Sequence, residues 1–239
     1  RKVMHMNLVQ SFFQEMKTSW TSCWSNRFFR VHFFFSFFIF AFVIHFSCMF
    51  LSIWETRKGF ILIDPLLSRL TPREFSTQIF ALVHSSLLIT LVLFLASPKK
   101  LLKALQAYAL VLFLRTLSIY ILPLEAPRGM IFLQDPVTAF FLNSVNVVTK
   151  DLFFSGHISA MCLFVYFTEN RIWKTYLMIA TPVLATMILW QHVHYSIDVM
   201  AAPLFTYLGC RFIDKVNETW EFGIDNIESK PLEAQRMLN

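Results

Sequence analysis

Six apolar runs dictate the solvent in which this chain folds. Most of them are about 20 residues long, which is enough for a helix to cross the hydrocarbon core of a bilayer. They cover residues 31–54, 78–96, 101–122, 154–168, 172–190 and 195–212. Hydrocarbon offers the backbone no hydrogen-bond partners, so only helices and closed barrels span it. We therefore predict an all-α, polytopic membrane protein with six transmembrane helices, of which the fourth is short.

The composition agrees with a bilayer as solvent and excludes some partners. Of the 239 residues, 56% are hydrophobic and 15% are charged, whereas soluble domains carry about 25% charged residues. The net charge of +6 comes from basic residues scattered among the turns, without the basic, aromatic-lined face of a nucleic-acid-binding protein. We expect membrane lipids and no nucleic acid as partners, and the sequence leaves a homo-oligomer open.

The basic residues also orient the chain, because Lys and Arg concentrate in short cytosolic loops. They precede the first run, flank the second and fourth connections, and follow the sixth run. Both termini are therefore expected in the cytosol. The predicted units are a cytosolic interfacial segment (1–30), a six-helix membrane catalytic domain (31–212) and a polar cytosolic tail (213–239).

Two short motifs lie at the outward, exoplasmic or lumenal ends of apolar runs. One is Ser155-Gly156-His157, and the other runs from His194 to Asp198. Residues four apart share a face of a helix, so the Asp198 carboxylate can orient the imidazole of His194. The Ser-Gly step stands where a helix is expected to begin, and a helix N-terminus binds anions. This pattern favours phosphate chemistry, with His157, His194 and Asp198 as catalytic candidates.

A cation lies inside the third run. Arg115 is seven residues from its end, and a buried guanidinium needs an anion. That anion is either a substrate phosphate or a carboxylate such as Asp151, and both pairings stay open. Tyr120, further out, is a candidate donor to a phosphate oxygen. His45 and His84, in the middle of runs, are interpreted as structural.

Metal chemistry and a serine nucleophile are the weaker interpretations. His192 and His194 point to different faces of a helix, which is poor zinc-ligand geometry. Ser155 has no base at a fixed spacing, so a helix cap or phosphate contact suits it better. We expect no metal and no cofactor.

Three segments resemble the sphingomyelin synthase family, a branch of the lipid phosphate phosphatase superfamily. They are the segment from Arg115 to Tyr120 with the following Leu122-Pro123, the block from Asp151 to His157, and the block from His194 to Val199. The resemblance covers residues 31–212 and includes the order of the blocks and the six-span layout. Two departures concern head-group and acceptor preference: Asp64-Pro65-Leu66 matches the family's Pro-rich block loosely, and Thr149-Lys150 replaces its Cys-Gly.

The resemblance implies transfer of a phospho-head group, phosphocholine or phosphoethanolamine, from a glycerophospholipid to ceramide, with release of diacylglycerol. His194, oriented by Asp198, would attack phosphorus, and His157 would act as acid and base. Ser155 and Gly156 would join Arg115 and Tyr120 at the phosphate, and Glu125, Asp135 and Asp151 are candidates for a cationic head group. The alternative is a lipid phosphatase or phospholipase C-like hydrolase. A phosphomonoester carries about two charges and calls for several cations, whereas Arg115 suits a singly charged diester.

Overall fold

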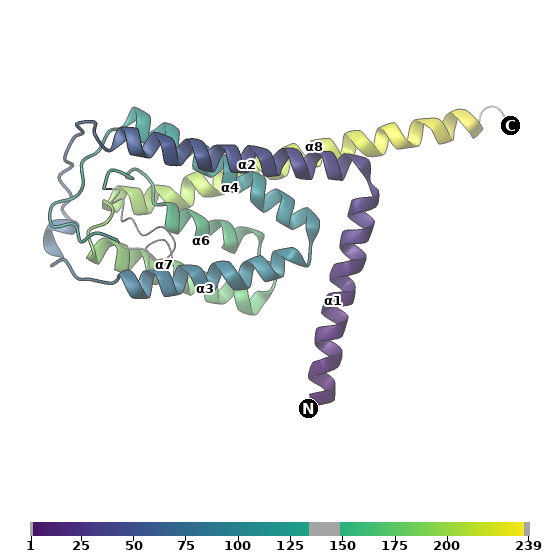
Figure 1. Cartoon of the computed structure of the whole chain (residues 1–239), viewed down its shortest axis with the longest axis horizontal. Coiled ribbons are helices and arrows are strands. Elements are labelled where there is room, and N and C mark those ends of the chain that lie inside the picture. The colour runs from purple at the N-terminus through teal and green to yellow at the C-terminus, as the bar shows by residue number, and fades with distance from the viewer. Residues whose placement is uncertain (1, 134–148, 237–239) are drawn as a thin grey trace.

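The computed structural model describes residues 2–133 and 149–236, and its architecture is helical (Figure 1). The all-α prediction is confirmed. Along the described chain the helices are α1 (Lys2–Ser25), α2 (Arg27–Trp54), α3 (Ser76–Leu95), α4 (Pro98–Ile121), α6 (Gly156–Phe167), α7 (Arg171–Trp190) and α8 (Ser196–Arg236), with a 3₁₀ turn, η1 (Leu67–Arg69), between α2 and α3.

Side chains at the helix starts explain several of these boundaries. The Asn26 side chain accepts hydrogen bonds from the backbone N–H groups of Phe28 and Phe29 at the start of α2. Asn170 accepts one from Trp173 at the start of α7. Such caps satisfy N–H groups that have no partner within the helix. At α4, Pro98 occupies the first turn, where the missing N–H costs nothing.

Five described helices are long and apolar enough to cross a membrane: α2, α3, α4, α7 and the first part of α8. The sixth apolar helix, α6, has only 12 residues, or about 18 Å at 1.5 Å per residue. It coincides with the run that the sequence marked as short. A polytopic membrane protein is therefore supported, while the count of six spans stays a prediction.

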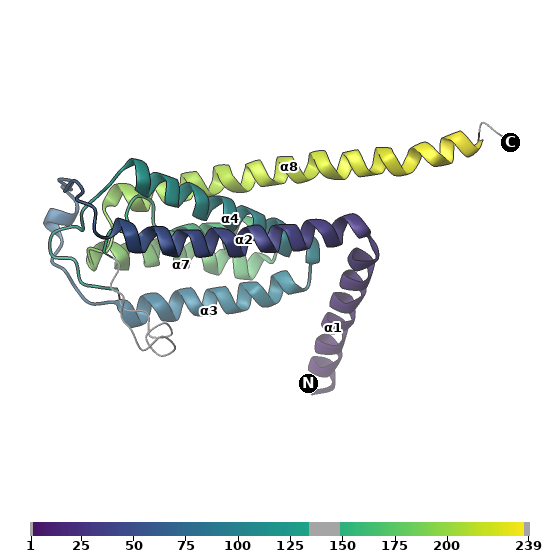
Figure 2. The ribbon, with the colours of Figure 1, turned by 45° about the horizontal axis from the view of Figure 1, so that its top comes forward.

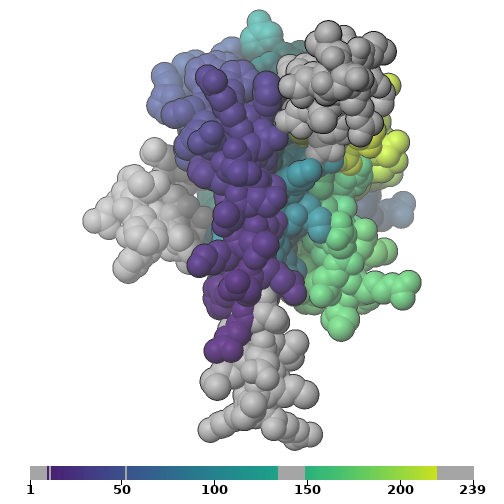
Figure 3. All heavy atoms as spheres, turned by 90° about the vertical axis from the view of Figure 1, so that its right-hand side faces the viewer, coloured from purple at the N-terminus to yellow at the C-terminus, as the bar shows by residue number. Residues whose placement is uncertain are grey.

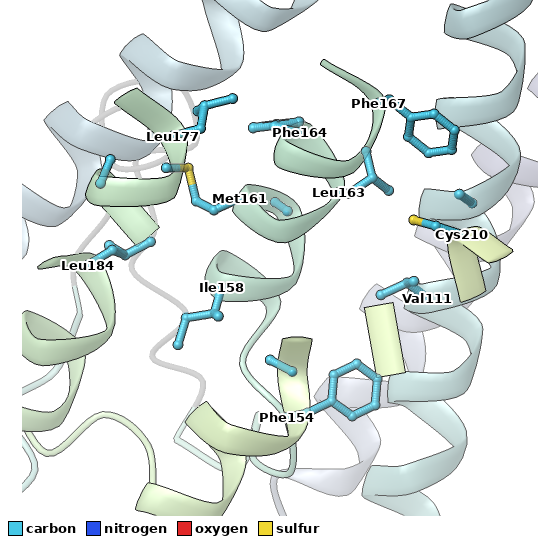
Figure 4. Packing of buried hydrophobic residues seen from close by; sticks show 14 of the residues in the cluster. Val111, Phe154, Ile158, Met161, Leu163, Phe164, Phe167, Leu177, Leu184 and Cys210 are labelled. Atoms are coloured by element: carbon cyan, nitrogen blue, oxygen red, sulfur yellow. The ribbon is translucent and has the colours of Figure 1, made fainter. Parts of the chain in front are cut away.

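The short helix α6 lies at the centre of the bundle and contacts α4, α7 and α8. Its side chains project in several directions: Figure 4 shows Met161 near Leu177 of α7, and Phe154, just before α6, on the side of Val111 of α4. Ile158 and Met161 are almost fully buried. Hydrophobic residues all round a helix are typical of one surrounded by others.

α1 and α2 lie at the periphery. α1 runs at a steep angle to the bundle and crosses its end (Figures 1 and 3). The Trp20 indole donates a hydrogen bond to the Leu95 carbonyl at the end of α3, 2.7 Å away. α2 packs on α4 and α1, and many of its phenylalanines are exposed. The position of α1 across the end of the bundle is compatible with the predicted interfacial segment (1–30). The side of the membrane on which it lies stays a prediction.

α8 continues well beyond the expected end of the last apolar run at 212, through to Arg236. The portion apolar enough to span a membrane is Ser196–Thr219. In two views the far part of α8 extends away from the bundle, on the side where α1 lies (Figures 1 and 2). The loops that carry the candidate residues gather at the opposite end.

The distribution of Lys and Arg predicts that the end of the bundle with the candidate residues faces the exoplasmic or lumenal side. Ile63, in the α2–α3 loop, is 95% exposed, and Ile172, at the start of α7, is 85% exposed. With the four native cysteines replaced by alanine, Ile63→Cys should react with a membrane-impermeant maleimide in intact spheroplasts. Ile172→Cys should react only after permeabilisation, because the start of α7, with Arg171 and Lys174, is expected in the cytosol. The reverse labelling pattern would contradict the predicted orientation.

Candidate active site

Arg115 joins α4 to the chain just before α6. Its side chain is buried, and Nε donates a hydrogen bond to the carbonyl of Phe154 at 3.0 Å. Nη2 donates to the carbonyl of Asp151 at 3.2 Å and pairs with the Asp151 carboxylate at 2.6 Å. The carboxylate pairing that the sequence left open is therefore present. The guanidinium thereby provides hydrogen-bond donors for carbonyls of the non-helical segment before α6. Non-helical backbone occurs at membrane depth only where protein or water supplies such partners.

That segment turns sharply at Phe153 and Phe154, whose φ angles of 67° and 40° lie in the left-handed region. This region is costly for residues other than glycine. The Phe154 ring stacks on Phe205 of α8, with ring centres 4.9 Å apart and planes 4° from parallel. Phe153 meets the same ring edge-on. Aromatic packing thus holds the turn that brings Ser155 to the start of α6.

The start of α6 combines features that favour an anion. Gly156 packs on the guanidinium of Arg115 so closely that a Cβ there would lie 3.2 Å from both Cζ and Nη1. Ser155 precedes the helix, and its buried hydroxyl has no hydrogen-bond partner within the described chain. The positive end of the α6 dipole and the positive charge of the guanidinium would both attract an anion at this point. Arg115, Ser155 and Gly156 are therefore brought together as the sequence predicted.

His194 and Asp198 are adjacent, but not on one helix. α8 begins at Ser196, so His194 lies in the preceding turn, which differs from the expected shared helical face. The Asp198 carboxylate nevertheless lies 3.3 Å from Nδ1 of His194 and accepts a hydrogen bond from the Tyr195 N–H at 3.0 Å. Both side chains are almost fully buried. An Nδ1–H that donates to Asp198 leaves Nε2 unprotonated, as a base or nucleophile requires.

The two motifs meet through the backbone. The Ser155 N–H donates to the Asp198 carbonyl at 3.2 Å, which links the start of α6 to the first turn of α8. His157 lies one residue into α6, half-buried, with its ring edge-on to Phe80 of α3 at 5.7 Å. The tertiary structure therefore gathers both motifs at one end of the bundle.

A cavity of about 490 Å³ between α3, α4 and α6 connects this end with the interior of the bundle. Arg115, Asp151, Gly156 and His157 line it at one end, and most of its remaining wall is apolar. From Arg115 to Leu101 it follows α4 for 14 residues, or roughly 20 Å. A polar end on a long apolar slot matches the shape and polarity of a lipid.

Two cavity residues escaped the sequence analysis as site candidates. His84 of α3 and Tyr108 of α4 both line the apolar part. His84 was interpreted as structural, and its ring stacks on Phe80 at 5.5 Å. The signal that marks both residues is a polar side chain inside an apolar run.

The remaining candidates have other surroundings. Tyr120 is half exposed and lies in an aromatic group at the outer end of α2, with Trp54 at 5.3 Å and the Arg57 guanidinium at 6.0 Å from its ring. It is not among the residues that line the cavity. Asp135 lies outside the described residues.

Glu125 is engaged by protein groups. It accepts hydrogen bonds from the Gly59 N–H at 2.7 Å and from the Lys150 ammonium at 3.1 Å. The Gly59 hydrogen bond, together with Lys150 and against the opposing effect of burial, lowers the pKa of Glu125. Lys150 is thereby paired outside the cavity. Its backbone N–H and that of Thr149 donate to Glu55 at the end of α2, which fixes the chain just before Asp151.

The described residues contain no group of three or more His, Cys, Asp or Glu side chains arranged to hold a metal ion. In comparisons with known proteins, residues 150–215 match the family model described as PAP2 superfamily C-terminal. The matched segment includes Asp151, Ser155-Gly156-His157, His194 and Asp198 but not Arg115. A search of curated proteins found no match.

The family match supports placing the chain in the lipid phosphate phosphatase superfamily. Together with the apolar helices, it supports an integral, multi-pass membrane protein with a lipid phosphatase or phosphotransferase type of activity.

The contact between Gly156 and Arg115 predicts the effect of a single methyl group. Gly156→Ala should displace the guanidinium and lower kcat/KM for a phospholipid substrate by roughly 100-fold, because small misplacements of a positioning group are that costly. Gly209→Ala is the matched control, since its Cβ would lie 3.2 Å from Val111, away from the site. Both can be measured by lipid turnover in detergent micelles; equal losses would mean that crowding of the bundle, and not the site, is responsible.

Proposed function

We propose that the chain transfers a phospho-head group, phosphocholine or phosphoethanolamine, from a glycerophospholipid to ceramide and releases diacylglycerol. The observation that carries the proposal is the cavity with Arg115, Gly156 and His157 at one end and an apolar wall along α3 and α4. An acyl chain of the phospholipid fits the apolar part of the cavity. The phosphate of the same lipid then lies at the Arg115 guanidinium and the start of α6.

The number of cations favours a phosphodiester. Among the described residues that line this cavity, Arg115 is the only Lys or Arg. Lys150, close by in sequence, is paired with Glu125. Residues 134–148 contain no Lys or Arg. A phosphomonoester carries about two negative charges near neutral pH, whereas a diester carries one. The guanidinium is already paired with the Asp151 carboxylate, so the two together carry no net charge, and this end of the cavity suits the smaller charge of a diester better than that of a monoester.

The proposed chemistry uses the two histidines in turn. Nε2 of His194, with Nδ1–H held by Asp198, attacks phosphorus, and the bond from phosphorus to the diacylglycerol oxygen breaks. His157 donates a proton to that oxygen. His157 then takes the proton of the ceramide hydroxyl, whose oxygen attacks phosphorus and frees His194. Arg115 and the N–H groups of α6 stabilise the phosphoryl oxygens.

The predicted orientation puts this reaction on the exoplasmic or lumenal side of the membrane. Of the three acids considered for a cationic head group, Asp151 lines the cavity, while Glu125 is engaged by Lys150 and Gly59. Of the two described acids, Asp151 is therefore the better placed, with one carboxylate oxygen already paired with Arg115. Its Oδ1 is buried without a hydrogen-bond partner in the part of the chain described.

Hydrolysis of the same lipids is the second candidate, because the superfamily match fits a phosphatase as well as a transferase. The same His194, His157 and Asp198 would serve, with water in place of ceramide. The two reactions share the attack of His194 on phosphorus and differ in the acceptor, ceramide or water.

The two reactions differ in their products. Purified protein should convert fluorescent ceramide and phosphatidylcholine or phosphatidylethanolamine into a sphingolipid that carries the head group, as identified by mass spectrometry. His194→Ala should reduce the rate by at least about 1,000-fold, because it removes the group that attacks phosphorus.

Ceramide dependence is the control for this assay. Diacylglycerol that forms at the same rate without ceramide, together with free phosphocholine or phosphoethanolamine, would establish hydrolysis and rule out the transferase. Full activity in His194→Ala would rule out both candidates as formulated.

A further inference from the structure

Asp64, in the loop between α2 and α3, caps a helix that begins 132 residues later. Its carboxylate accepts hydrogen bonds from the backbone N–H of Ser196 at 2.7 Å and from the Ser196 hydroxyl at 2.7 and 2.8 Å. It also accepts the N–H groups of Leu66 and Leu67 at 2.9 and 3.1 Å, which fixes it in its own loop. Ser196 is the first residue of α8 and lies between His194 and Asp198.

The capping of Ser196 concerns Asp198 directly. A carboxylate in the first turn of a helix is attracted to the free N–H groups at the helix start. Asp198 already accepts the N–H of Tyr195 with Oδ2, the same oxygen that lies against His194. If Ser196 were uncapped, its N–H and hydroxyl would be two further donors close to Asp198. Asp64 occupies both.

A second contact fixes the same turn from the same loop. The Tyr195 hydroxyl accepts the Leu62 N–H at 3.3 Å and donates to the Glu125 carbonyl at 3.0 Å. The α2–α3 loop therefore holds Tyr195 and Ser196, the two residues that follow His194 in the chain. Because the loop also holds its own carboxylate through Leu66 and Leu67, it acts as a rigid support for the start of α8.

We propose that Asp64 is a positioning residue for the proposed reaction: by capping Ser196 it leaves the carboxylate of Asp198 free to hold the imidazole of His194. The assignment rests on the proposed function of His194 and Asp198. Asp64 is suited to this role near neutral pH, since hydrogen bonds from Ser196, Leu67 and Leu66 lower its pKa despite the opposing effect of burial.

Asp64→Asn tests the proposal with little change in volume. The amide has one acceptor oxygen, so it cannot take the place of both carboxylate oxygens. We expect kcat to fall roughly tenfold with KM for the phospholipid unchanged, as for other residues that orient a catalytic group. Glu74→Gln is the matched control: Glu74 is in the same loop but accepts the N–H of Ser76, at the start of α3. It should keep the kcat of the parent protein.

A double-mutant cycle separates positioning from general support of the fold. If Asp64 acts through Asp198, Asp64→Asn should change kcat by less than about twofold when Asp198→Asn is already present. A tenfold loss in both backgrounds would show independent effects and overturn the proposal. Ser196→Ala keeps the backbone hydrogen bond and provides a milder variant should Asp64→Asn not fold; its expected loss is about threefold, with the same non-additivity.

A nuclear magnetic resonance experiment tests the same proposal without an assay of lipid transfer. In ¹⁵N-histidine-labelled protein in nanodiscs, the His194 resonances are assigned by their loss in His194→Ala. Asp64→Asn should shift the Nδ1 resonance, whereas Glu74→Gln should not. A shift without measurable lipid transfer would retain the positioning of His194 and reject only the proposed function. Unchanged His194 resonances in Asp64→Asn would overturn the role of Asp64, whatever the activity.

Discussion

The ion pair and hydrogen bonds of Arg115 are the interaction on which this site depends. A guanidinium buried within a span is costly unless its donors are paired. Here it pairs with the carboxylate of Asp151 and donates to two carbonyls of the segment before α6. One side chain thereby stabilises the non-helical backbone before α6 and places a positive charge beside Gly156.

The loops at this end of the bundle supply the partners that the helices lack. Glu55 holds the chain before Asp151, Glu125 pairs with Lys150, and Asp64 caps α8. Each contact joins segments that are distant in sequence. Because these acids are satisfied by protein groups, few charges are left for a ligand. The polar end of the cavity is therefore defined by Arg115, Asp151 and His157.

The cavity has an apolar part and a polar end. The wall along α3 and α4 is largely apolar, while Arg115 and Asp151 lie at the end of the cavity next to the start of α6. His194 and Asp198 are not among the described residues that line this cavity, and the hydrogen bond from the Ser155 N–H to the Asp198 carbonyl joins their turn to the start of α6. This gradient of polarity is the feature on which the proposed binding of a lipid phosphate rests.

The sequence by itself determined the helical class, the positions of the apolar helices, the shortness of the fourth run and the two histidine motifs. These follow from hydropathy and spacing, which are local properties. It could not decide between Asp151 and a substrate as the partner of Arg115, nor show that His194 precedes α8, that Tyr120 packs with Trp54, or that Glu125 is engaged by Lys150. Only the tertiary structure decided these points, because the choice of a polar side chain's partner depends on which distant segments the fold brings within hydrogen-bonding distance, as Asp64 and Ser196 illustrate.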